Sequence, residues 1–168
     1  MGHPVLRERA RPLDKSDFRS AVVQKLIDDM IDTMHEYHGV GLAAPQVHEG
    51  LRMFVALLDD EPDAKSEAVV VINPEIVANS QATEEGWEGC LSIPDIRGTV
   101  PRFTDIRVQA LDRTGKTIDL GLKNFPARVA QHETDHLDGI LFFDRMKSFG
   151  TLTFMDEYSR FWSKDEDA

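Results

Sequence analysis

The chain has 168 residues, a formal net charge of -11 and a single cysteine. This length predicts that residues 1–168 form a single domain around one hydrophobic core. The negative charge argues against binding to DNA or to anionic lipid, because both need a basic protein surface. The lone cysteine excludes an intrachain disulfide and favours a reducing compartment.

The N-terminal residues and the apolar runs bear on localisation. The stretch MGHPVLRERARPLDK is charged and lacks the apolar region of a secretory signal. No apolar run reaches the length of about 18 residues that a membrane-spanning helix needs. We therefore expect a cytoplasmic protein without a membrane partner, and an organelle origin stays open because a transit peptide could have been removed.

The first half of the chain predicts one helix followed by strands. Residues 20–37 carry apolar side chains at helical spacing, with Ser20 as a candidate N-cap and Gly39 as a candidate stop. The apolar runs 53–58 and 68–72 predict buried strands, and Pro74 is expected to end the second.

The second half predicts a hairpin and two further helices. Residues 103–111 alternate in part, the turn DRTG follows, and residues 116–122 are expected to return antiparallel. Asn124 can cap a helix over 125–138, residues 140–146 predict a short strand or extended segment, and residues 152–162 predict a C-terminal amphipathic helix. This order predicts an α+β fold. Its antiparallel strands would pack around the central helix 125–138, with helices near both ends.

The stretch QHETDHLDG places two histidines on that central helix. His132 and His136 are four residues apart, so both rings lie on one face and can converge on one metal ion. Glu133 between them is close enough to handle a proton from a metal-bound water. Asp135 is a candidate for orienting a ligand from behind.

A catalytic metal site normally needs a third protein ligand, and the residues alone leave two choices. Glu157, downstream, would make a gluzincin-like metallopeptidase. Cys90, upstream in EGCLSIP, would supply a thiolate, which is a strong ligand for a borderline divalent metal. A further alternative is a metal-binding or interaction module without catalysis.

Three stretches resemble the three signature motifs of the peptide deformylases, in the same order. They are GVGLAAPQ (39–46), EGCLS (88–92) and QHETDH (131–136). The resemblance implies a hydrolase of linear N-formyl amides that removes the formyl group from the N-terminal formylmethionine of nascent polypeptides and releases formate. It also implies a bacterial-type cytoplasmic enzyme.

The resemblance assigns the chemical roles. It implies that Cys90, His132 and His136 bind one divalent metal, ferrous iron in most members, with zinc, nickel or cobalt able to occupy the site. A metal-bound water would be the nucleophile and Glu133 the general base and then acid. Gln46 and the backbone NH of Leu91 would stabilise the oxyanion.

The resemblance also assigns substrate contacts. The backbones of Val40, Gly41 and Gly89 are expected to pair with the peptide like an added strand, and Arg97 to contact the substrate backbone. The methionine pocket is expected to be lined by Val40, Trp87, Phe125, Arg128 and Val129. For Arg128 an ion pair with Glu88 is an equal alternative.

The implied partner is an N-formylmethionyl nascent peptide, which brings the enzyme transiently near the ribosome. Some family members dock there through a basic C-terminal helix. The C-terminal residues MDEYSRFWSKDEDA are acidic, so this mode of docking is not expected here.

Overall fold

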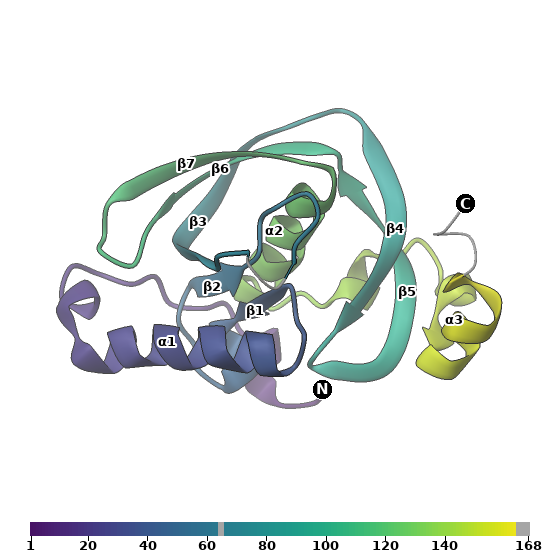
Figure 1. The fold of residues 1–168 in the computed structure, drawn as a ribbon, viewed down its shortest axis with the longest axis horizontal. Helices are drawn as coiled ribbons and strands as arrows, with labels where there is room; N and C mark the ends of the chain where they lie inside the picture. Colours follow the sequence, from purple (N-terminus) through teal and green to yellow (C-terminus); the bar gives the residue numbers. More distant parts are fainter. Residues whose placement is uncertain (64–65, 164–168) are drawn as a thin grey trace.

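The computed structural model describes residues 1–63 and 66–163, and the last five residues of the acidic C-terminal stretch lie outside that range. The described residues form three α-helices and eight β-strands (Figure 1). The helices are α1 (Ala21–Glu36), α2 (Asn124–Leu137) and α3 (Met155–Phe161). The strands are β1 (Gly41–Ala43), β2 (Met53–Ala56), β3 (Val69–Asn79), β4 (Thr83–Cys90), β5 (Ile93–Phe103), β6 (Asp105–Leu111), β7 (Thr117–Lys123) and β8 (Thr153–Phe154).

The strands form two antiparallel sheets, which makes the fold a mixed α and β architecture. One sheet has the order β1-β2-β3-β6-β7 and the other has the order β4-β5-β8. The pairing of β6 with β7 runs without interruption from Asp105 opposite Lys123 to Leu111 opposite Thr117, as the hairpin turn predicted. Strands β1 and β4 each lie at the edge of their sheet, so each has one unpaired side.

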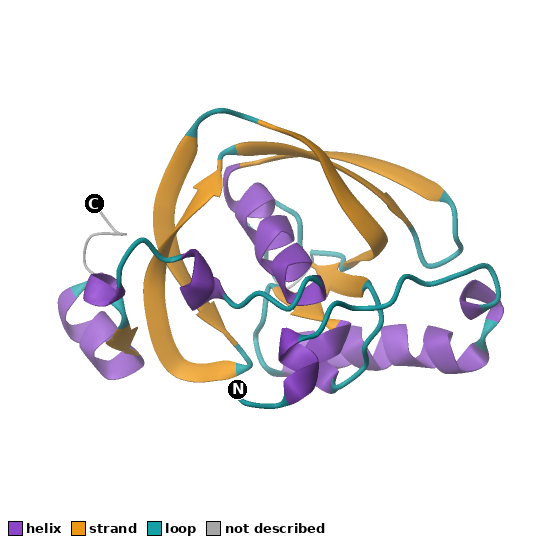
Figure 2. Ribbon diagram, turned by 180° about the vertical axis from the view of Figure 1, so that it is seen from behind, coloured by secondary structure: helices purple, strands orange, loops and turns teal. Residues whose placement is uncertain are grey.

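Helix α2 packs against strands of both sheets, and the strands arch around it in both ribbon views (Figures 1 and 2). It is buried on most of its surface, including the polar residues Gln131, Glu133, Thr134, Asp135 and His136. Buried polar groups need hydrogen-bonding partners, so this helix carries candidate functional side chains as well as core residues.

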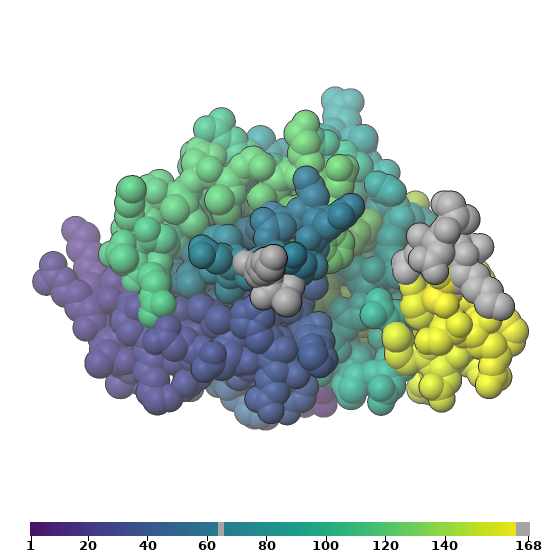
Figure 3. Space-filling view, viewed as in Figure 1, coloured from purple at the N-terminus to yellow at the C-terminus, as the bar shows by residue number. Residues whose placement is uncertain are grey.

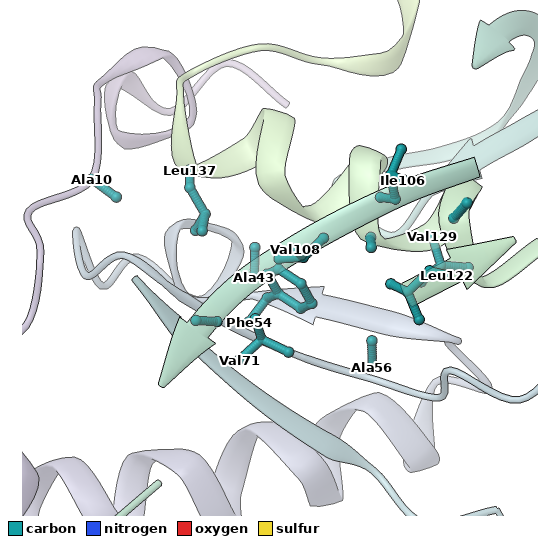
Figure 4. Packing of buried hydrophobic residues seen from close by; sticks show 13 residues of the cluster. Ala10, Ala43, Phe54, Ala56, Val71, Ile106, Val108, Leu122, Val129 and Leu137 are labelled. Atoms are coloured by element: carbon teal, nitrogen blue, oxygen red, sulfur yellow. The ribbon is translucent and has the colours of Figure 1, made fainter. Parts of the chain in front are cut away.

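Two apolar clusters flank the first sheet. On one side, Phe54, Val71 and Val108 pack with Val129 and Leu137 of α2 (Figure 4). On the other side, α1 buries a stripe at helical spacing, made of Val23, Ile27, Met30 and Met34. The helix predicted over residues 20–37 is thus confirmed, with Ser20 at its N-cap position.

Helix α2 ends at Leu137, two residues before a glycine that suits a helix end. Gly139 adopts a φ of +73°, in the left-handed region that favours glycine. A Cβ at this position would lie 2.7 Å from the backbone of Arg7, so the N-terminal segment crosses here only because the residue is glycine.

Some element predictions were wrong. Strand β3 continues through Pro74 to Asn79, because its register with β6 shifts between Ile72 and Glu75 and the irregularity accommodates the proline. Within residues 140–146, predicted as a short strand or extended segment, residues 142–145 form a short 3-10 helix instead. The predicted C-terminal helix is shorter, since Thr153 and Phe154 form β8 before α3 begins.

The pair β4 and β5 was not predicted from the sequence. Strand β5 contains Pro94 and Pro101, which argue against a central strand. Pro94 lies where the register between β4 and β5 shifts, and among the described residues β8 pairs with β5 only at Ile96 and Arg97, which leaves Pro101 without a partner strand on that side. None of the helices in the described ranges is long and apolar enough to cross a lipid bilayer.

Two positions on α1 test this packing. Ile27 is fully buried and Val22 is 78% exposed. Ile27→Ala is expected to lower the free energy of unfolding by about 2–5 kcal/mol, because it leaves a cavity under the sheet. Val22→Ala should change it by less than about 0.5 kcal/mol. Urea unfolding of the two variants measures the difference, and equal effects would contradict the placement of α1.

Candidate metal centre and active site

Helix α2 presents the two histidines from one face. The rings of His132 and His136 lie 5.0 Å apart between centroids and are steeply inclined. His136 is fully buried, whereas His132 retains partial exposure toward a cavity. The spacing of one helical turn therefore produces the convergence that the sequence predicted.

Cys90 joins the histidines from the second sheet. It is the last residue of β4, where the register with β5 shifts between Gly89 and Cys90. Its Sγ lies 3.2 Å from Nε2 of His136. Ligand atoms of Cys90, His132 and His136 all lie within 4.8 Å of one another, and this is the three-residue group of metal-binding type found among the described residues.

Glu88 holds His132 from behind. The Nδ1 atom of His132 lies 2.9 Å from Oε2 of Glu88, so Nε2 is the ring nitrogen left for a ligand. Burial lowers the pKa of His132, but hydrogen bonds with Cys90 and Glu88 outweigh burial and raise it to about 10. These neighbours thus favour positive charge at the ring, which either a proton or a metal ion supplies.

Arg102 fixes Glu88 through a buried ion pair. Its Nε and Nη2 atoms donate to the two carboxylate oxygens of Glu88 at 2.9 Å and 3.0 Å, and its Nη1 donates to Asp135 at 2.5 Å. Asp135 also accepts from Arg145. Burial alone would raise the pKa of Glu88, but the hydrogen bonds from His132 and Arg102 lower it to about 2. Asp135, the candidate for orienting a ligand, therefore connects to Glu88 and His132 through Arg102.

Glu133 faces the cavity without a hydrogen-bond partner for Oε2. The residue is only 4% exposed, and burial raises the pKa of its carboxyl to about 7. A Cβ on Gly41 would overlap this carboxyl group, so glycine at the start of β1 makes room for it. A carboxyl group with a pKa near neutrality can both accept and donate a proton.

Gln46 connects the first motif to the second. Its Oε1 accepts from the backbone NH of Ala43 at 2.8 Å, which turns its amide NH₂ toward the second sheet. There Nε2 lies 3.5 Å from Sγ of Cys90 and 3.3 Å from Oγ of Ser92. A donor is thereby placed beside the Cys-His-His group.

A cavity of about 690 Å³ opens beside these groups. The walls include Gln46, Leu91, Cys90, His132 and Glu133. They also include every residue predicted to contact substrate, namely Val40, Gly41, Trp87, Gly89, Arg97, Phe125, Arg128 and Val129. His136 lies buried just behind the wall, where burial lowers its pKa well below the ordinary value and keeps the ring neutral.

Arg128 and Glu157, two side chains considered for the site, each have an ion-pair partner. Arg128 lines the cavity, yet its guanidinium group donates to Glu88 at 2.9 Å and to the carbonyl oxygens of Val100 and Glu84. The ion-pair alternative for Arg128 is thus observed, in a largely buried rather than surface setting. Glu157 lies on α3, pairs with Arg160 at 3.3 Å and is not part of the three-residue ligand group.

The sequence did not single out Arg102. It follows Glu88 by fourteen positions and reaches it only because β4 and β5 form a hairpin. A hairpin prediction over residues 83–103 would have placed the two on one face. The prolines in β5 argue against a strand there, so the sequence did not predict this hairpin.

A family model described as polypeptide deformylase matches residues 1–151. The chain belongs to the polypeptide deformylase family. A peptide deformylase 2 of Nostoc sp. is 42% identical over 170 residues, covering 98% of this chain and 93% of the relative. The match to the family model ends before α3.

Solved structures of family members show the same fold. The class I type b peptide deformylase of Acinetobacter baumannii with Met-Ala-Ser bound has a TM-score of 0.81 and 41% identity, covering 87% of this chain and 94% of that one. The peptide deformylase of Thermotoga maritima has a TM-score of 0.80 and 43% identity, covering 88% and 95%. This chain is accordingly an enzyme of the peptide deformylase type.

Glu88→Gln tests the support behind His132. The variant removes the carboxylate that orients the ring, so the affinity for Zn²⁺ should fall about 10- to 100-fold. Competition with a chromophoric chelator measures this. Glu85→Gln is the control, because its exposed carboxylate lies on the same strand and pairs with Lys147 at the surface. Equal affinities for both variants would contradict the orienting role.

The same variant tests the ionisation of Glu88 in metal-free protein. A pKa lowered from 4.5 to about 2 means that ionised Glu88 stabilises the fold above pH 4.5 and that this stability is lost as the pH falls toward 2. The difference in unfolding free energy between wild type and Glu88→Gln should therefore narrow across that range. A difference that stays constant would show that Glu88 is not held ionised.

Proposed function

We propose that this enzyme removes the N-formyl group from the N-terminal formylmethionine of newly synthesised polypeptides and releases formate, with one divalent metal held by Cys90, His132 and His136. The observation that carries the proposal is the convergence of these three ligands, with Cys90 and His132 on the cavity wall beside Glu133 and Gln46, and His136 just behind it. Each comes from one of the three motifs, and the motifs are far apart in the chain.

The donor set fits a divalent transition metal. One thiolate and two imidazoles suit iron, zinc, nickel and cobalt better than the hard cations calcium and magnesium, and a three-ligand group leaves a position for water. We propose Fe²⁺ as the working metal, with Zn²⁺, Ni²⁺ or Co²⁺ able to replace it. When bound, the metal lowers the pKa of a water toward neutrality and draws electrons from the formyl oxygen.

Glu133 would act as the general base and then as the general acid. Its unpartnered Oε2 faces the cavity, and its pKa of about 7 suits a group that takes a proton from water and returns it to the leaving amine. Gly41 permits this placement, since any larger residue there would displace the carboxyl group.

Gln46 and the backbone NH of Leu91 would stabilise the oxyanion. Gln46 has its amide fixed by Ala43, so its NH₂ is oriented before substrate arrives. Leu91 directly follows Cys90 and lines the cavity. Two oriented donors of this kind could each lower the barrier by roughly 3–4 kcal/mol, as in other oxyanion holes.

The peptide would bind as an extended strand between the two sheets. Strands β1 and β4 are both edge strands, and residues of both line the cavity. Pairing with Val40, Gly41 and Gly89 would extend a sheet by backbone hydrogen bonds, which leaves the sequence of the nascent chain free to vary. The Acinetobacter baumannii relative has been solved with Met-Ala-Ser bound, which supports a peptide in this cavity.

The first side chain of the peptide would lie against α2. Val129 and Phe125 provide apolar surface there, whereas Trp87 points to the opposite face of β4 from Glu88. Arg128 would shape the pocket through its aliphatic stem, because its guanidinium group is committed to Glu88 and three carbonyl oxygens. The metallopeptidase alternative has less support, since Glu157 lies outside the ligand group.

The general base can be tested by a matched pair of variants. Glu133→Gln should lower kcat for formyl-Met-Ala-Ser by about 10²–10⁴, because it removes the proton carrier. Its metal content should stay at one per chain. Glu157→Gln should keep both turnover and metal. Formate release with anaerobically loaded iron and elemental analysis are the two measurements.

The outcomes separate the alternatives. Loss of metal and activity in Glu157→Gln would favour a gluzincin-like metallopeptidase. Retained turnover in Glu133→Gln would refute its role as base. If the wild type released no formate, only the metallopeptidase and the metal-binding or interaction module would be left.

A further inference from the structure

Helix α3 covers the outer face of the β4–β5 hairpin, beyond the residues that the family model matches. Figure 3 shows this C-terminal segment in yellow beside the teal strands. Tyr158 is its buried anchor: its ring meets Trp87 edge-on at 4.9 Å, and the guanidinium group of Arg97 lies 5.1 Å from its centroid. Trp162 adds a second contact to Trp87 at 5.6 Å.

The hairpin has two chemically different faces. Glu88 and Arg102 point toward α2 and form the buried ion pair there. Because side chains alternate along a strand, Trp87 and Gly89 point the other way, and Arg97 opposite Gly89 shares that face. This second face is the one that α3 covers.

Met155, the first residue of α3, extends the cavity wall onto this second face. Its sulfur accepts a hydrogen bond from Nε of Arg97 at 3.1 Å, and Met155, Arg97 and Trp87 all line the cavity. Met155 is half-buried, so part of its thioether side chain stays available for contact. Within the described residues, Arg97 forms no ion pair that would draw it away from this wall.

We propose that Met155 is a specificity-determining residue that contacts the side chain following formylmethionine and favours a large apolar one. The proposal rests on the proposed function. A peptide strand added at the free edge of β4 would place alternate side chains on opposite faces. If the first lies against Val129 and Phe125 on the α2 side, the second lies on the α3 side, beside Met155 and Trp87.

The chemistry of this wall suits an apolar side chain. A methionine thioether is flexible and polarisable, so it can adapt to side chains of different shape. Trp87 adds a rigid aromatic surface, held in place by Tyr158. Burying additional apolar area against these two residues favours leucine over alanine at the second position of the peptide.

The test compares formyl-Met-Leu-Ser with formyl-Met-Ala-Ser. The ratio of their kcat/KM values should exceed one for the wild type and fall about fivefold in Met155→Ala, the effect expected for a half-buried apolar contact. The fall should come from KM for the leucine peptide rather than from kcat. Met155→Leu should restore the ratio, because it replaces the lost apolar volume.

Phe161→Ala is the matched control. Phe161 lies on the same helix, is 63% exposed and does not line the cavity, so its removal should leave the ratio at the wild-type value. An unchanged ratio in Met155→Ala, or an equal loss for both peptides, would overturn the assignment of Met155 while formate release continues. If the wild-type enzyme released formate from neither peptide, the proposed function itself would be overturned.

Discussion

The hydrogen bond between Glu88 and His132 is the contact on which the site depends. It joins strand β4, which ends in Cys90, to helix α2, which carries both histidines. If the sheet and the helix packed only through apolar contacts, they could shift relative to each other by a fraction of an ångström. A shift of that size would disturb the positions of the three metal ligands. A hydrogen bond of 2.9 Å between a largely buried carboxylate and the imidazole removes that freedom.

Burying this carboxylate is costly, and the surrounding charges show how the fold offsets the cost. Arg102 gives Glu88 two hydrogen bonds and gives Asp135 a third, so one guanidinium group links both ends of the arrangement. A well-satisfied network of this kind contributes more to a unique geometry than to net stability. The rigid side of the site is therefore ionic, whereas Glu133, the proposed general base, is left without a hydrogen-bond partner on one oxygen.

The grouping of the candidate site residues was predictable from the sequence because these residues lie in short motifs. Helical spacing brings His132 and His136 together, and the β6–β7 hairpin follows from its turn residues. The distant support was not predictable, because it depends on the pairing of β4 with β5. Pro94 and Pro101 in β5 argue against a strand, so the sequence does not predict that pairing. The position of α3 beside the cavity depends on contacts with Trp87, which no local sequence pattern predicts.

The central claim is that a cysteine from one sheet and two histidines from one helix form a single metal centre. X-ray absorption spectroscopy of the metal-loaded wild-type protein tests it most directly, because sulfur and imidazole ligands scatter differently. The account predicts one sulfur ligand and two imidazole ligands, with the sulfur contribution lost in Cys90→Ser. A first shell of nitrogen and oxygen alone in the wild type would contradict it.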